Sequence, residues 1–484
     1  MVRARPHGAP LRHSRASSSD ANPGTVRVAG IADGSSEGRP PSLVIRAPRD
    51  PAREMTSTNT RSEVGENLRV FCGIDWAERH HDIALIGQDG GLIAKRRIND
   101  GPDGFDALTA MLTAAGDTAE DPIPVAIETP RGLLVAALRA TTRPVFAINP
   151  MAVARYRERH SVARAKSDHA DAMTLANILR TDSHAHRKMP ADTDLARAIS
   201  VLARAAQDAI WRRTRATLEL RSLLREYYPG FLAAFARDGG NGVTNLAGSD
   251  ARHVLALAPT PAAGARISVA RIAAALRRGG RKRGADTRAA AIAQALRAPQ
   301  LRQPQLIEQA MSRQALALLR TLNAECDNAE QLGEASIEAF RSHPDHAIIT
   351  SFPGLGELTG ARILGELGDD RARFADARAV KAYAGSAPVT RASGRNTVIM
   401  RRQVKNNRLA AVGFVWAFAT MASTGPPKDH YDQRRAHGDR HAAALRHLFN
   451  RMIGQLHHCL QTRRPYDPIK AFPERAPEPQ PSAA

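Results

Sequence analysis

Two carboxylates end apolar segments, where a charged side chain is costly unless it is paired or binds a metal ion. Asp75 ends the segment 70–75, VFCGID, and Glu128 ends the segment 124–128, PVAIE. Taken alone, either residue also fits a strand-end cap or a salt-bridge partner. Together they are candidates for the ligands of one metal ion.

A second pair of carboxylates, Asp168 and Asp171, follows Ser167, a residue that suits a helix N-cap. A spacing of three places both Asp side chains on one helix face, although the helix dipole alone also favours acidic residues there. Four hard oxygen ligands suit Mg²⁺ or Mn²⁺. Two such ions, roughly 3.5–4 Å apart, activate water and stabilise the leaving oxygen when a phosphodiester is cleaved.

The elements that must position these residues are predicted from apolar periodicity. Strands are expected at 70–75, 82–86, 92–98, 124–128 and 145–148, and helices at 104–115 and 133–140. Three consecutive strands followed by alternating helix and strand are the order of an α/β ribonuclease-H-like fold with a mixed five-stranded sheet. The first and fourth strands are neighbours in that fold, so Asp75 and Glu128 are expected to converge.

The remaining chain is predicted to be mainly helical. Long helices at 195–235 and 303–340 indicate an antiparallel coiled-coil hairpin that can join subunits, or an ordinary helical subdomain. The expected parts are a disordered basic tail at 1–66, the carboxylate domain at 67–190, the helical region at 191–344, a C-terminal domain at 345–465 and a disordered tail at 466–484. An insertion at 238–300, rich in Gly, Ala and Arg, predicts no clear elements.

The charge balance points to a polyanionic partner. Lys and Arg number 69 against 48 Asp and Glu, a formal net charge of +21. The longest apolar run, 412–422, is far short of the roughly 20 residues that span a bilayer, and no apolar region of a signal peptide follows the basic start. Three cysteines without a CxxC pair fit a reducing cytoplasm. Nucleic acid is therefore the expected partner, and no membrane association is expected.

Two segments of the C-terminal domain carry residues suited to phosphate contacts. SFPGLG at 351–356 precedes a predicted helix and is typical of a helix-hairpin-helix element, in which Gly354 and Gly356 let backbone amides approach a phosphate. A basic segment follows further along the chain. Its candidate nucleic-acid contacts are Arg391, Arg395, Arg401, Arg402 and Lys405.

Three motifs together resemble the DEDD-type transposases of insertion sequences, whose N-terminal domain is similar to Holliday-junction resolvases. They are GIDWA at 73–77, IETP at 127–130 and KSDHADA at 166–172. The resemblance covers about 68–235 and 345–435. It implies that Asp75, Glu128, Asp168 and Asp171 are the catalytic metal-binding quartet.

The same resemblance implies a serine nucleophile. The family's C-terminal transposase domain carries a Ser-Gly loop whose serine attacks the DNA phosphate, and that serine matches Ser393 here. Ser386 stands where the family has an apolar residue, so it is a lesser candidate and a departure from the pattern. The residues alone fit an ordinary Ser-Gly turn, and no His-Asp partner is evident to activate the hydroxyl.

The function that this resemblance implies is excision and insertion of an insertion element by a cytoplasmic, DNA-associated bacterial transposase. Its implied partners are double-stranded DNA, a structured guide RNA encoded by the element, and further copies of the chain in a dimer or tetramer. In that assembly the carboxylate domain of one subunit meets the serine loop of another. Two alternatives remain: a metal-dependent junction nuclease without a covalent serine step, and a non-catalytic nucleic-acid-binding scaffold with a structural acidic quartet.

Overall fold

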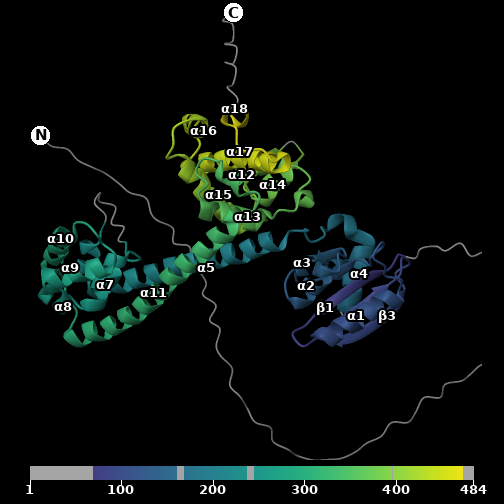
Figure 1. Cartoon of the computed structure of the whole chain (residues 1–484), viewed down its shortest axis with the longest axis horizontal. Helices are drawn as coiled ribbons and strands as arrows, with labels where there is room; N and C mark the ends of the chain where they lie inside the picture. The colour runs from purple at the N-terminus through teal and green to yellow at the C-terminus, as the bar shows by residue number, and fades with distance from the viewer. Residues whose placement is uncertain (1–68, 161–167, 237–244, 395, 473–484) are drawn as a thin grey trace, which may run out of the picture. The chain divides into compact units, whose positions relative to one another are not determined.

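The computed structural model describes residues 69–160, 168–236, 245–394 and 396–472. Figure 1 shows a sheet with its helices, a pair of long helices with a cluster of short ones, and a C-terminal helical part. The predicted tail at 1–66, the end of the second predicted tail, Ser167 and Arg395 lie outside the described residues, as does the side chain of Asp168.

A mixed five-stranded sheet opens the described chain, in the order β3-β2-β1-β4-β5. Strand β2 pairs antiparallel with β1 and β3, whereas β4 runs parallel to β1 and β5. The strands are β1 (Phe71–Trp76), β2 (His80–Ile86), β3 (Leu92–Asn99), β4 (Val125–Ile127) and β5 (Val145–Ala147). All five predicted strands are confirmed, and so is the neighbouring position of the first and fourth.

Side chains alternate along the strands, so the sheet has two apolar faces. Ile74 and Ile127 belong to the buried cluster on the face covered by α1 and α2. Phe71 and Ala126 belong to the cluster on the opposite face, which α3 and α4 cover. The covering helices are α1 (Pro102–Ala114), α2 (Leu133–Ala140), α3 (Pro150–His160) and α4 (Asp168–Asp182), followed by a 3₁₀ turn at Ser183–Ala185.

Helix α4 contacts β1 at Gly73, where the two backbones touch. A Cβ atom at Gly73 would lie 2.0 Å from the Ala172 carbonyl oxygen and 2.6 Å from the Ala176 nitrogen. Ala172 and Ala176 are themselves small and fully buried. Gly73 and Asp75 are two residues apart on one strand, so both point to the face that α4 covers.

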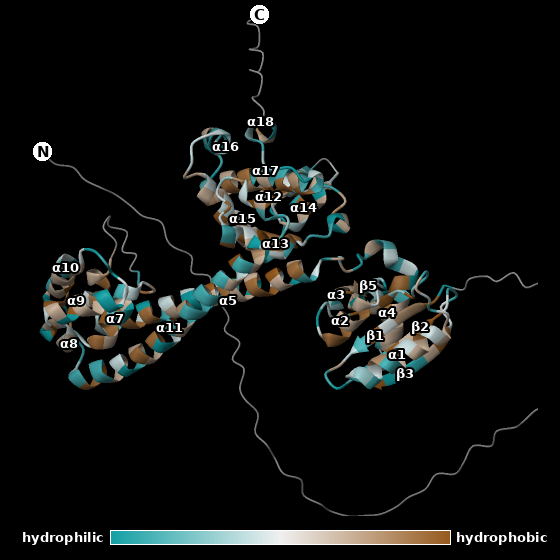
Figure 2. Ribbon diagram, viewed as in Figure 1, coloured by the Kyte–Doolittle hydropathy of each residue, from teal (hydrophilic) through white to brown (hydrophobic). Residues whose placement is uncertain are grey.

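The two long helices α5 (Asp194–Tyr227) and α11 (Gln305–Arg341) pack side by side and antiparallel. Arg212 donates to Glu325 at 2.7 Å near their middle, whereas Gln303 donates to the Glu226 carbonyl at 3.1 Å near the end of α5. Polar and apolar residues alternate along both helices in Figure 2. The predicted antiparallel helical hairpin is confirmed.

The seam of α11 follows the heptad spacing of a coiled coil. Its buried residues recur at alternating intervals of four and three, and they are Glu308, Ser312, Ala315, Leu319, Leu322, Cys326, Ala329, Gly333, Ser336 and Phe340. Helix α5 ends at Tyr227, earlier than the predicted 235, because Pro229 lacks the amide hydrogen that would continue the helix.

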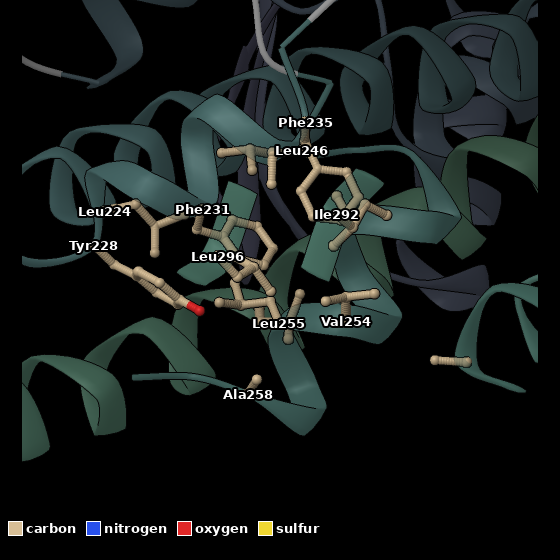
Figure 3. Close-up of a cluster of buried hydrophobic side chains, with 14 of the residues drawn as sticks. Leu224, Tyr228, Phe231, Phe235, Leu246, Val254, Leu255, Ala258, Ile292 and Leu296 are labelled. Carbon is tan, nitrogen blue, oxygen red and sulfur yellow. The ribbon is translucent and has the colours of Figure 1, made fainter. Parts of the chain in front are cut away.

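The insertion folds into a small helical unit around the end of this pair. Figure 3 shows Tyr228 and Phe231 close to Leu296 of α10, within one buried cluster that also contains Val254 of α7. The short helices here are α6 (Pro229–Ala234), which precedes the insertion, and α7 (Ser249–Leu257), α8 (Pro261–Arg266), α9 (Val269–Arg278) and α10 (Ala285–Arg297) within it. A segment that predicted no clear elements therefore forms helices that share a core with α5 and α11.

The C-terminal part is mainly helical, with one two-stranded hairpin. The buried Trp416 lies in its core against Phe352 and Phe449. Its elements are α12 (His346–Thr350), α13 (Glu357–Leu367), a 3₁₀ turn at Arg371–Arg373, α14 (Ala377–Tyr383), β6 (Val389–Ser393), β7 (Asn396–Met400), α15 (Asn407–Thr420), α16 (Pro426–Ala436), α17 (His441–Thr462) and α18 (Pro468–Ala471).

The buried carboxylate of Glu366 on α13 joins four helices. It accepts two hydrogen bonds from Arg204 of α5, at 2.8 and 2.9 Å, and one from Asn406 at 2.7 Å. Asn406 also caps α15 and donates to the Tyr383 hydroxyl of α14 at 2.7 Å. The hydrogen bonds to Glu366 hold the pKa of Arg204 above its ordinary value, although burial opposes this.

The second predicted tail begins later than expected. Tyr466 stacks on Phe352 with ring centroids 4.6 Å apart, and Asp467 caps α18 by accepting from the amides of Ile469 and Lys470. Residues 466–472 are therefore folded, and the prediction of disorder is wrong for them. The Pro-rich composition concealed an aromatic anchor.

The apolar run 412–422 lies in α15 and supplies core residues such as Trp416. In the parts of the chain that the structure describes, no helix has both the length and the apolar character needed to cross a bilayer. Cys72, Cys326 and Cys459 are all buried and free, as the lack of cysteine pairs predicted.

We expect Gly73→Ala to destabilise the sheet domain by about 1–3 kcal/mol, because the new methyl group meets the α4 backbone. Thermal unfolding of the full chain followed by circular dichroism measures the shift. Gly333→Ala is the matched control, since a Cβ there makes only an ordinary contact 3.9 Å from Leu358. Equal unfolding temperatures for the two variants would contradict the close packing.

We expect Glu366→Gln to lower the free energy of unfolding by about 1–3 kcal/mol, because it leaves the Arg204 guanidinium without its carboxylate. Urea denaturation monitored by Trp fluorescence measures the loss, since Trp416 lies in the same core. The control is Glu334→Gln, an exposed carboxylate on α11. A midpoint no lower than that of the control would show that the Glu366 network contributes nothing to stability.

Candidate active site

The carboxyl ends of β1 and β4 bring Asp75 and Glu128 together. The two strands are parallel and pair Ile74 with Ile127, so the next residues along them are Asp75 and Glu128. Neighbouring strands lie about 4.8 Å apart, and both side chains point to the face opposite Ile74 and Ile127. That face is the one that α4 covers. The predicted convergence follows from this register.

Helix α4 runs back across the sheet, so its first turn lies near the same edge. Arg180, close to its last residue, donates to the Gln88 carbonyl at 3.4 Å, in the turn joining β2 and β3. That turn is at the end of the sheet where β1 begins. Because the middle of α4 crosses β1 at Gly73, Asp168 and Asp171 lie toward the other end, where Asp75 is.

Asp171 is buried and forms an ion pair with Arg157 of α3. This guanidinium satisfies the carboxylate in the structure as it stands. A cation that binds Asp171 must therefore displace or share this arginine. Asp168 is the first residue of α4, which fits the predicted helix, and its side chain lies outside the described residues.

The donors at this edge suit a hard divalent cation. Asp75, Glu128 and Asp171 all offer carboxylate oxygens, the ligands that Mg²⁺ and Mn²⁺ prefer. Among the described side chains, which leave out that of Asp168, no three His, Cys, Asp or Glu form a group that could hold a metal ion. The carboxylate oxygens suit Mg²⁺ or Mn²⁺ as ligands. In the described geometry, one of these carboxylates, Asp171, is paired with Arg157.

Asp82 is a further carboxylate on this face, and the sequence prediction missed it. It lies directly opposite Asp75 in the β1–β2 register, so the two side chains share a face. Asp82 is 2% exposed and accepts three hydrogen bonds from Arg97 of β3, with a shortest distance of 2.7 Å. The signal was present, since an acidic residue opens an otherwise apolar strand two residues after His80.

Ser393 is the last residue of β6, at the tip of the β6–β7 hairpin. It pairs with Asn396, and Gly394 between them has a φ of 56°, which suits the tight turns of two-residue hairpins. Ser393 and Arg391 are exposed, and Arg395 lies outside the described residues. Among the described residues, no group hydrogen-bonds to the Ser393 hydroxyl. The hairpin presents Ser393 without an activating partner from the described part of its own chain.

The base of this hairpin is firmly held. The Asn406 amide donates to the Tyr383 carbonyl at 2.8 Å, which closes the segment that contains both strands. Gly385 has a φ of 71°, and a Cβ there would lie 2.0 Å from the Lys405 Cδ atom. The Lys405 stem therefore lies directly on Gly385. A rigid base thus carries an exposed two-stranded ribbon.

The other predicted phosphate contacts of this segment follow β7. Arg401 is exposed and directly follows the strand, whereas Arg402 is half-buried and its Nε donates to the Ala387 carbonyl at 3.4 Å. Ser386 is 3% exposed, and its hydroxyl lies 2.9 Å from the Asn450 side-chain oxygen. Ser386 is therefore a buried structural serine, which explains how a polar residue occupies this position.

The turn predicted to contact phosphate packs against α15. A Cβ at Gly354, whose φ is 76°, would lie 2.6 Å from the Thr420 nitrogen, and the Pro353 carbonyl accepts from Trp416 at 2.9 Å. Gly354 is thus required by packing. Gly356 faces open space at the start of α13, but Glu357 places a carboxylate there, paired with Arg341 at 2.6 Å. An anion at that helix end would meet this charge.

Two family models match parts of this chain. Residues 72–229 match a family model described as a transposase, and residues 346–432 match the model of the transposase IS116/IS110/IS902 family. The chain is 56% identical over 408 residues to the mini-circle putative transposase for IS117 of Streptomyces coelicolor, which covers 84% of this chain and 97% of that protein.

Two more distant relatives agree with this assignment. An uncharacterized 43.6 kDa protein of the insertion element IS110 from Streptomyces coelicolor is 26% identical over 406 residues, covering 81% of this chain and 94% of its own. A putative transposase of Sinorhizobium fredii, y4uE, is 34% identical over 175 residues, 35% of this chain and 49% of that protein. The two family models and the relatives agree: the chain is a transposase and belongs to the IS116/IS110/IS902 family.

Proposed function

We propose that this transposase cuts and rejoins DNA phosphodiesters in a composite site, made of the carboxylates at the edge of the sheet and Ser393 on the hairpin. The observation that carries the proposal is the β1–β4 register, which makes Asp75 and Glu128 neighbours under the first turn of α4. Asp171, on the helix that covers this face, lies toward the same edge of the sheet.

The metal ligands that we propose are Asp75, Glu128, Asp168 and Asp171, in a sheet domain of the ribonuclease-H-like type. When bound there, Mg²⁺ or Mn²⁺ supplies Lewis-acid activation of a phosphodiester and its leaving oxygen. Arg157 keeps Asp171 neutralised until then, and the Asp82–Arg97 pair places a fixed, compensated charge beside Asp75. The protein thereby holds several carboxylates close together at an acceptable electrostatic cost.

Ser393 is the proposed nucleophile. In cleavage its Oγ forms a bond to phosphorus while the bond to the leaving sugar oxygen breaks, and the hydroxyl proton passes to water while the leaving oxygen takes one up. Rejoining reverses these steps with a new sugar hydroxyl. No described residue of this chain hydrogen-bonds to Ser393. We propose that the DNA complex or another subunit supplies the activation that this hydroxyl needs.

The proposed partners are double-stranded DNA at the element ends and target, a structured guide RNA, and further copies of this chain in a dimer or tetramer. The net charge of +21 supports binding of polyanions. Helix α5 exposes Val201 at 67% and Leu218 at 61%, although its other face already packs on α11. Exposed apolar side chains on this helix support association between subunits. The exposed Arg391, with Arg395, Arg402 and Gly356, remains a proposed contact to nucleic acid.

We expect Asp75→Asn to reduce excision of a donor element by at least about a hundredfold, because the loss of one carboxylate weakens charge stabilisation in the transition state. The assay counts excised junctions by quantitative PCR with purified protein and Mg²⁺. Asp121→Asn, an exposed carboxylate in the loop before β4, is the control. Full excision by Asp75→Asn would remove both enzymatic interpretations of the quartet and favour the scaffold.

We expect Ser393→Ala to abolish the covalent protein–DNA adduct, because no other hydroxyl occupies the hairpin tip. Denaturing gels of a labelled element end detect the adduct. Thr390→Ala tests a hydroxyl on the same exposed strand and should keep it. If Ser393→Ala still cleaves the DNA at the same sites, the serine mechanism is wrong and the metal-dependent nuclease is the better description.

A further inference from the structure

A cavity of about 480 Å³ opens at the base of the β6–β7 hairpin. Its walls come from the turn after α14, the segment after β7, one face of α15 and the first half of α17. Four cationic side chains line it: Arg401, Lys405, Arg440 and Arg446. None of the residues that line this cavity is acidic.

These four cations have no carboxylate partner among the described residues. Two other arginines of the C-terminal part do have carboxylate partners: Arg408 binds Asp208 at 2.8 Å, and Arg434 binds Asp439 at 2.5 Å. Like charges gathered in one cavity repel one another, and a bound anion removes that cost. The cavity therefore has the electrostatics of an anion site.

The positions of the cations are fixed by the fold. The Lys405 stem lies on Gly385, so its ammonium end lines the cavity. Arg446 shares one face of α17 with Ala442 and Phe449, at spacings of four and three residues. Arg440 directly precedes α17, whose first turn has no side-chain cap. Cations from two separate segments of the chain thus meet around one space.

Most of the remaining lining is apolar. A bare phosphate would leave this apolar surface exposed to water. Phe414 of α15 is 47% exposed and lines the cavity, one helical turn after Ala410. Phe449 lies beneath, 4% exposed. The volume falls within the range of pockets that hold small organic ligands. A ligand with a phosphate at one end and a flat apolar ring at the other matches both parts.

We propose that this cavity binds one unpaired nucleotide of the DNA, with its phosphate among the four cations and its base against Phe414. Bases taken out of the stack are commonly held on aromatic side chains and by surrounding cations. The inference rests on the proposed function in one respect, namely that DNA passes along the serine hairpin, the β6–β7 hairpin that carries Ser393. Ser393 lies four residues beyond Val389, about 13 Å from the base of the hairpin, or about four base steps of a DNA strand.

The test is fluorescence anisotropy with the full chain and three labelled DNA duplexes of one sequence. One carries a single unpaired thymidine, one carries an abasic site in its place, and one is fully paired. We expect the duplex with the unpaired thymidine to bind about tenfold more tightly than the abasic one, because one stacked base is gained. Equal binding of all three duplexes would overturn the proposal.

Two sets of variants assign the preference to the cavity. Phe414→Ala should erase the difference between thymidine and abasic duplexes while keeping the affinity for the abasic one. Arg440→Gln combined with Arg446→Gln should weaken the binding of both duplexes. The effect should exceed that of Arg320→Gln, which replaces an exposed arginine on α11. A preference that survives Phe414→Ala would place the base elsewhere. Stronger binding of a matching unpaired RNA nucleotide would replace DNA as the occupant.

The same probes separate this inference from the proposed function. Ser393→Ala should keep the thymidine preference, since Ser393 lies at the far end of the hairpin. Loss of the adduct with an intact preference supports both proposals. If the unmodified chain forms the adduct but shows no thymidine preference, only the nucleotide cavity is rejected. If Ser393→Ala keeps the preference and still forms the adduct normally, only the serine mechanism is rejected.

Discussion

The contact between two backbones at Gly73 is the constraint on which the carboxylate edge depends. Only a residue without a side chain lets the Ala172 carbonyl and the Ala176 amide reach the strand. This contact fixes the height of α4 above β1, and the Arg180–Gln88 hydrogen bond fixes its direction. Given both, Asp171 must lie toward the end of β1 that carries Asp75. Packing with no chemistry of its own thus determines where the chemistry can occur.

In the C-terminal part, a polar interaction positions the hairpin that carries Ser393. Glu366 is buried, so it needs its partners, and one of them, Asn406, also closes the base of the β6–β7 hairpin that carries Ser393. Asn406 binds Glu366 with one end of its side chain while its other end caps α15. The hairpin itself is an isolated pair of strands, which is marginally stable without further packing. A rigid base and an exposed ribbon suit a part that becomes ordered against DNA or another subunit.

The sequence predicts the strands and the Asp75–Glu128 pair well, because alternation and strand order depend on local pattern. It could not predict that Arg157 pairs with Asp171, since that contact joins two helices whose packing is set by the whole sheet. Gly354 was assigned to phosphate binding because a Pro-Gly turn has the same letters whether it meets an anion or the end of α15. Asp82 was overlooked because its neighbours read as a plain strand, and only the register shows it beside Asp75.

The charges at the two parts of the proposed site differ in how they are compensated. Asp171 and Asp82 are each neutralised by an arginine, so the carboxylate edge does not present its full negative charge. The cations at the base of the serine hairpin, in contrast, have no described acidic partner. DNA phosphates are attracted to these cations, whereas carboxylates without their arginine partners would repel them. In this proposal, a metal cation binds Asp171 in place of Arg157. Its binding is most favourable when DNA phosphate oxygens arrive at the same time, because the cation then balances their negative charge. In the proposed mechanism, this balance of charge would couple cleavage to assembly.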